Sequence, residues 1–98
     1  MEKYEIYLGE LIAVKESVAE EFKKKALAIP YKQGTVAFAL DYWTLWGDTI
    51  KILNDKLLTT ANNILSSGRI PDHEQENAVD VLREHCIELI KKFSEENR

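Results

Sequence analysis

The chain has 98 residues, which is enough for one domain with one hydrophobic core. Hydrophobic residues make up 45% of the chain and charged residues 31%, which is typical of a folded protein and excludes a disordered one. The net charge of −4 argues against nucleic acid and anionic membranes as partners, because both favour a basic surface.

Several features of the sequence predict a cytoplasmic location. Cys86 is the single cysteine, so an intramolecular disulfide cannot form, and a lone thiol suits a reducing compartment. The N-terminal residues lack the apolar core of a signal peptide. Every apolar run is shorter than the ~20 residues that a helix needs to cross a bilayer, so no membrane contact is expected.

Apolar residues recur every three or four positions through the first third of the chain, as on one face of an amphipathic helix. They are Tyr4, Tyr7, Leu8, Leu11, Val14, Val18, Phe22, Ala26 and Ile29. The pattern predicts a helix over about 3–28. The helix should end before Pro30, because a proline disfavours helical geometry in the residue ahead of it. The short loop that follows makes the next helix an antiparallel neighbour.

The middle of the chain predicts the longest helix, over about 35–67, with Thr35 as its N-cap. One apolar row recurs every seventh residue, and we assign it to the core. This row is Val36, Trp43, Ile50, Leu57 and Ile64. The row continues across Gly47 without a change of phase, which favours one helix. The alternative is a break at Gly47, with a C-cap and a new N-cap, which would give four helices.

A third helix is predicted over about 72–95. Gly68 suits the left-handed end of the preceding helix, and Pro71 suits the start of the next one. Three helices joined by two short loops predict an all-α fold, an antiparallel up-down-up bundle in a single domain, 1–98. A break at Gly47 would turn it into a bundle of four helices.

The middle helix carries a second apolar row, which points roughly opposite to Trp43 and Ile50. This row is Phe38, Tyr42, Leu45 and Ile52. A helix of a three-helix bundle offers one face to the core, so a second apolar face needs another cover. We therefore predict these four residues as a partner interface, with a homodimer as the expected assembly. In the alternative interpretation, the first and third helices bury both rows.

No catalytic, metal or cofactor site is predicted. Asp41, Asp48 and Asp55 lie seven residues apart on one face, but carboxylates about 10 Å apart along a helix cannot share one ion. His85 and Cys86 are adjacent, so their side chains point about 100° apart. Cys86 lies on the apolar stripe of the third helix and is predicted to pack as a small hydrophobic residue.

Six lysines gather at one end of the predicted bundle. They are Lys23, Lys24, Lys25, Lys32, Lys91 and Lys92. They either form an anion site or complement the negative ends of the helix dipoles, and the second interpretation is favoured.

These features together predict a non-enzymatic protein–protein interaction or regulatory protein that works as a homodimer without a cofactor. The alternative function is a small all-α enzyme that acts on phosphorylated metabolites, with an acidic metal site completed across a dimer.

Overall fold

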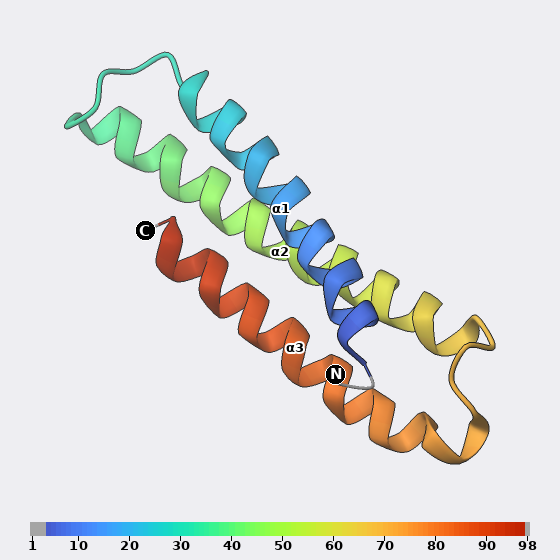
Figure 1. Cartoon of the computed structure of the whole chain (residues 1–98). Coiled ribbons are helices and arrows are strands. Elements are labelled where there is room, and N and C mark those ends of the chain that lie inside the picture. The colour runs from blue at the N-terminus through green and yellow to red at the C-terminus, as the bar shows by residue number, and fades with distance from the viewer. Residues whose placement is uncertain (1–3, 98) are drawn as a thin grey trace.

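The computed structural model describes residues 4–97 as three long helices and one short 3-10 turn (Figure 1). The helices are α1 (Glu5–Leu27), α2 (Val36–Ser66) and α3 (Gln75–Glu96), and the 3-10 turn η1 (Asp72–Glu74) precedes α3. Each long helix packs against the other two, and consecutive helices run antiparallel. The predicted all-α, up-down-up bundle is therefore confirmed. No helix within 4–97 combines the length and the apolar character that a membrane span requires.

Helix α2 is continuous through Gly47, so the alternative of four long helices is wrong. Its first turn is closed as predicted, because the Thr35 hydroxyl accepts a hydrogen bond of 3.1 Å from the Phe38 amide. At its other end Gly68 has a φ of +82°, a left-handed conformation that glycine adopts without steric cost.

The core lies along the axis of the bundle and takes side chains from all three helices. The largest fully buried ones are Leu11 of α1, Leu53, Leu57 and Ile64 of α2, and Leu82 and Phe93 of α3. Phe22 packs edge-on against Phe93, with 5.5 Å between the ring centroids, and joins α1 to α3.

The seven-residue row of α2 does not lie in the core along its whole length, which corrects the sequence-based assignment. Val36 is 77% exposed and Trp43 is exposed as well, whereas Ile50 is half-buried and Leu57 is completely buried. A straight helix has 3.6 residues per turn, so a seven-residue repeat drifts by about 20° per heptad. Over the four heptads from Val36 to Ile64 the row turns by about 80°, from the surface into the core.

Helix α3 is shorter than α2 and ends beside the second turn of α2. The Tyr42 hydroxyl donates a hydrogen bond of 2.7 Å to the carbonyl of Asn97, the residue after α3. Among residues 4–97, the first turn of α2 therefore has α1 as its only helical neighbour. Figure 1 shows this end, with the α1–α2 loop, projecting past the C-terminal end of α3.

Candidate partner-binding surface

The structure places the four residues of the predicted interface on one side of α2, where Tyr42 and Ile52 lie next to α1. Tyr42 and Leu45 are partly buried against the core. The Phe38 ring stacks on that of Tyr42, with 5.8 Å between centroids. Ile52 is 42% exposed and lines a shallow pocket together with Phe22 of α1. The role of these residues in partner binding stays a prediction, but Phe38, Tyr42 and Leu45 are already partly buried within the single chain.

Tyr42 shows that the row of Phe38, Tyr42, Leu45 and Ile52 contributes to packing within the single chain. Its ring packs edge-on against Phe22 of α1, at 5.6 Å between centroids. Its hydroxyl bonds to the Asn97 carbonyl beyond α3. One side chain thus connects all three helices, and a half-buried tyrosine with a satisfied hydroxyl is a stable packing element.

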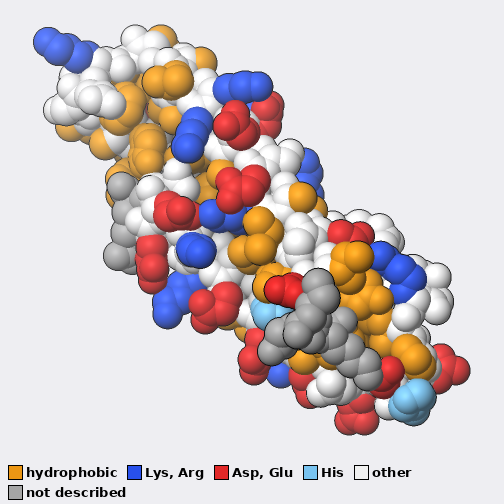
Figure 2. All heavy atoms as spheres, viewed as in Figure 1, with side chains coloured by type: hydrophobic (Ala, Val, Ile, Leu, Met, Phe, Trp, Pro, Cys, Tyr) orange, Lys and Arg blue, Asp and Glu red, His pale blue; other side chains and the backbone are white. Residues whose placement is uncertain are grey.

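A different face of α2 carries apolar side chains that remain exposed. We call it the α2 strip, and it consists of Val36, Leu40, Trp43, Gly47, Ile50, Asn54, Leu58 and Leu65, of which Gly47, Ile50 and Leu65 are partly buried and Asn54 is polar. At about 100° per residue, these positions fall within a sector of roughly 80°. Leu40 is 64% exposed and Leu58 is 56% exposed. Figure 2 shows hydrophobic side chains gathered at the end of the molecule that holds the α1–α2 loop, where the strip begins.

The second half of the strip borders an apolar groove between α2 and α3. The groove has a volume of about 270 Å³. Its apolar lining is Leu58, Ala61, Leu65, Val79, Leu82, Cys86, Ile87 and Ile90. Three exposed polar residues also line it, Asn54, Asn62 and Arg83. Val79 and Ile87 of α3 are large hydrophobic residues that remain exposed here. A mainly apolar lining with a few polar residues is common at protein–protein interfaces.

Cys86 lies half-buried in this groove, with its sulfur 4.0 Å from the carbonyl oxygen of Leu57. Burial raises the pKa of the Cys86 thiol, because the low-dielectric surroundings disfavour the thiolate. The thiol is therefore less nucleophilic than an exposed cysteine. The groove consequently offers apolar contact rather than reactive chemistry.

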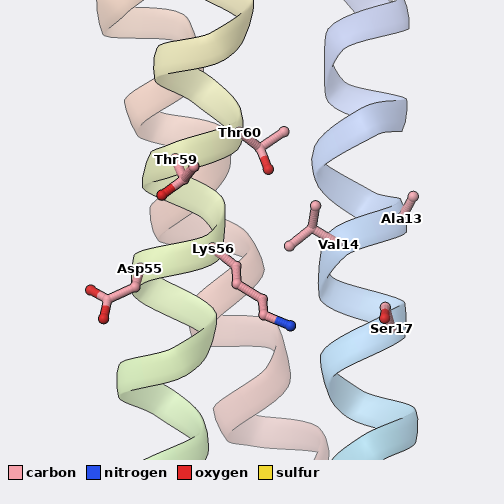
Figure 3. A pocket seen from close by; sticks show the side chains of 7 residues that line it. All are labelled: Ala13, Val14, Ser17, Asp55, Lys56, Thr59 and Thr60. Atoms are coloured by element: carbon pink, nitrogen blue, oxygen red, sulfur yellow. The ribbon is translucent and has the colours of Figure 1, made fainter.

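A pocket with a volume of about 480 Å³ lies between α1 and α2 (Figure 3). Lys56 extends between the two helices and Val14 faces it from α1, whereas Asp55 and Thr59 point away. The pocket thus presents one ammonium group, small alcohols and apolar carbon. It does not bring together the paired titratable groups that acid–base catalysis uses.

The acidic and soft-ligand residues also stay apart in the fold. Asp41, Asp48 and Asp55 are all exposed on α2. His73 is next to the start of α3, and His85 lies three turns further on, in a groove between α1 and α3. Within residues 4–97, no three His, Cys, Asp or Glu side chains are arranged to hold a metal ion.

The predicted basic end contains a carboxylate that partly neutralises it. Glu96 accepts a hydrogen bond from Lys15, and this bond, with the charges of Lys15, Lys92 and Lys23, lowers the pKa of the Glu96 carboxyl. Lys23, Lys24 and Lys25 are exposed near the end of α1. Anion binding at this end stays a prediction.

Sequence reasoning missed Lys15, which is only 5% exposed. Its position carries a signal, because Leu11, Lys15, Val18 and Phe22 follow the three- and four-residue spacing of one helix face. A lysine at that spacing can bury its aliphatic stem while its ammonium group meets a carboxylate.

No protein-family model, curated protein or solved structure matches this chain.

Proposed function

We propose that the protein is a non-enzymatic interaction protein that works as a homodimer, with the α2 strip as its binding surface. The observation that supports this proposal is the exposed apolar face that follows α2 from Val36 to Leu65 and continues into the α2–α3 groove. Large continuous apolar patches are uncommon on monomers and mark binding sites. Burial of this face against a second chain would remove it from water.

The side chains of the α2 strip suit protein binding better than catalysis. The exposed tryptophan, leucines and valine of the strip offer apolar contact, and aromatic residues are enriched where proteins bind one another. Within the described part of the chain, the α2–α3 groove has Arg83 as its one charged lining residue, and in the α1–α2 pocket Asp55 points away from Lys56. Such a surface suits reversible assembly and regulation by association.

Static light scattering on the purified chain tests the proposal. The wild-type mass is expected at twice 11.3 kDa. Leu58→Glu is expected to give the mass of one chain. Burying a leucine side chain is worth about 1.5–3 kcal/mol, and a dimer contains two of them, so dimerisation should weaken at least about 100-fold.

Ile6→Glu is the matched control, because Ile6 is 68% exposed on α1 and lies outside the strip and the groove. It should keep the wild-type mass. A wild-type protein with the mass of one chain at all concentrations would contradict the homodimer. A melting temperature raised by several degrees with Mg²⁺ and a nucleotide would favour the enzymatic alternative instead.

A further inference from the structure

We infer that two copies of this chain pair through their α2 strips with the helices antiparallel, so that Val36 of each copy lies against Leu65 of the other. The inference rests on the proposed function, because it names the arrangement of the proposed dimer. It follows from two properties of the strip: its symmetry about Ile50 and the difference between its two ends.

The strip is complementary to itself when it is reversed. It runs from Val36 to Leu65, so its midpoint is near Ile50. An antiparallel pair centred there places Gly47 of one copy opposite Asn54 of the other. A methyl group at Gly47 would meet nothing within 4 Å, so the surface is open there and leaves room for the Asn54 amide. The polar residue of one strip therefore meets the smallest residue of the other.

The two ends of the strip differ in a way that favours the antiparallel arrangement. At the Val36 end, α2 has α1 as its only helical neighbour within the described part of the chain, because α3 ends level with Tyr42. At the Leu65 end, α3 runs beside α2 and forms the apolar groove. An antiparallel pair sets the uncovered end of each copy over the groove of the other. A parallel pair would leave both grooves open to water.

Trp43 is the side chain that this arrangement brings to the groove. It is exposed in the single chain, and the reversed register places it opposite Leu58 on the groove wall. The groove volume of about 270 Å³ and its apolar lining suit an indole ring. A tryptophan that fills an apolar pocket of its partner is a common energetic centre of an interface.

The strip supplies a large part of the area that a standard protein–protein interface buries. From Val36 to Leu65 the helix rises by about 44 Å and is ~10–12 Å wide, which gives on the order of 500 Å² per copy. The rim of the groove on α3 adds to this area. The sum approaches the ~800 Å² per partner of a standard protein–protein interface.

Cross-linking between two different cysteine variants tests the inference. Val36→Cys and Leu65→Cys are made separately in full chains in which Cys86 is replaced by alanine, and light scattering verifies that this background keeps the wild-type mass. The two variants are refolded together and treated with a short bis-maleimide. In a parallel pair residues 36 and 65 are about 44 Å apart, beyond the reach of the reagent. We expect a cross-linked dimer of one Val36→Cys chain and one Leu65→Cys chain, at the yield that random pairing of the two variants allows. Each variant treated alone should stay unlinked.

A second pair, Trp43→Cys with Leu58→Cys, repeats the test nearer the midpoint and covers the case in which one variant folds poorly. Self-linked Val36→Cys would show a parallel dimer and overturn the inference, while the homodimer stands. A dimer mass without mixed product in either pair would place the interface elsewhere and also overturn it. A monomeric wild type would overturn both the inference and the proposed function.

Discussion

Lys15 of α1 forms an ion pair with Glu96, the last residue of α3, and the two sit in very different surroundings. Lys15 is almost completely buried, whereas the side chain of Glu96 is 53% exposed. A second carboxylate, Glu16, is 3.9 Å from the Lys15 ammonium group and is also solvated. The fold therefore buries the cation and leaves its partner in water.

This asymmetry predicts different effects for the two halves of the pair. Glu96→Gln should destabilise the protein more than Lys15→Met, because it leaves a buried ammonium group without its closest carboxylate. Lys15→Met removes the buried charge and keeps an apolar chain, while Glu96 can be hydrated. Urea denaturation measures the free energy of unfolding of both variants, with Glu16→Gln as the control for the longer contact. A larger loss of unfolding free energy for Lys15→Met than for Glu96→Gln would contradict the prediction.

The same pair gives stability a defined dependence on pH. Lys15 lowers the pKa of Glu96 in the folded protein below its ordinary value of 4.5. The unfolded chain therefore binds a proton first as the pH falls, so the stabilisation is complete above pH 4.5 and decreases as the pH falls through the folded pKa. The stability difference between wild type and Glu96→Gln should be constant at neutral pH and shrink in acid. A difference that grows on acidification would refute this.

Gly47→Ala is expected to stabilise the fold. Gly47 lies inside α2, the added methyl group would have open space around it to 4 Å, and no positive φ requires glycine there. Alanine in a helix interior is favoured over glycine by about 1 kcal/mol. Urea denaturation in the Leu58→Glu background isolates this effect from dimerisation. In the wild-type background the gain should be smaller, because the methyl group takes space assigned to Asn54 of the second copy.

The drift of the seven-residue row predicts opposite results at its two ends. In the Leu58→Glu background, Val36→Ala should change the free energy of unfolding by less than about 0.5 kcal/mol, because surface substitutions usually have small effects. Leu57→Ala should cost about 2–5 kcal/mol, because Leu57 is completely buried and its truncation leaves a cavity. Similar losses at both positions would show that the whole row lies in the core.

The sequence predicts this fold well because its signals are local. The Thr35 cap, the left-handed glycine at Gly68 and the proline at Pro30 bound the helices close to where the structure has them. The uninterrupted phase through Gly47 indicates one helix, as observed. The orientation of α2 could not be read in the same way, because a strict seven-residue repeat assumes supercoiling that a straight helix lacks.

The candidate surface depends on contacts between segments far apart in the chain, which periodicity does not reveal. Tyr42 is held by Phe22 and by the carbonyl of Asn97, 55 residues away. Those contacts turn the face of α2 that holds Tyr42 toward the other helices. Val36, Leu40 and Trp43, on a different face of α2, are exposed instead. The sequence does indicate that α2 has two apolar faces. Which one is exposed depends on where α3 ends.

Ile52 and Leu58 distinguish the interface predicted from the sequence from the α2 strip. Both are large, exposed and on α2, but Ile52 faces the side toward α1 and Leu58 borders the α2–α3 groove. Ile52→Glu should keep the dimer mass in light scattering, because its carboxylate stays in water, whereas Leu58→Glu should give single chains. Circular dichroism melting verifies that both variants fold. If Ile52→Glu dissociates the dimer and Leu58→Glu does not, the row of Phe38, Tyr42, Leu45 and Ile52 is the interface.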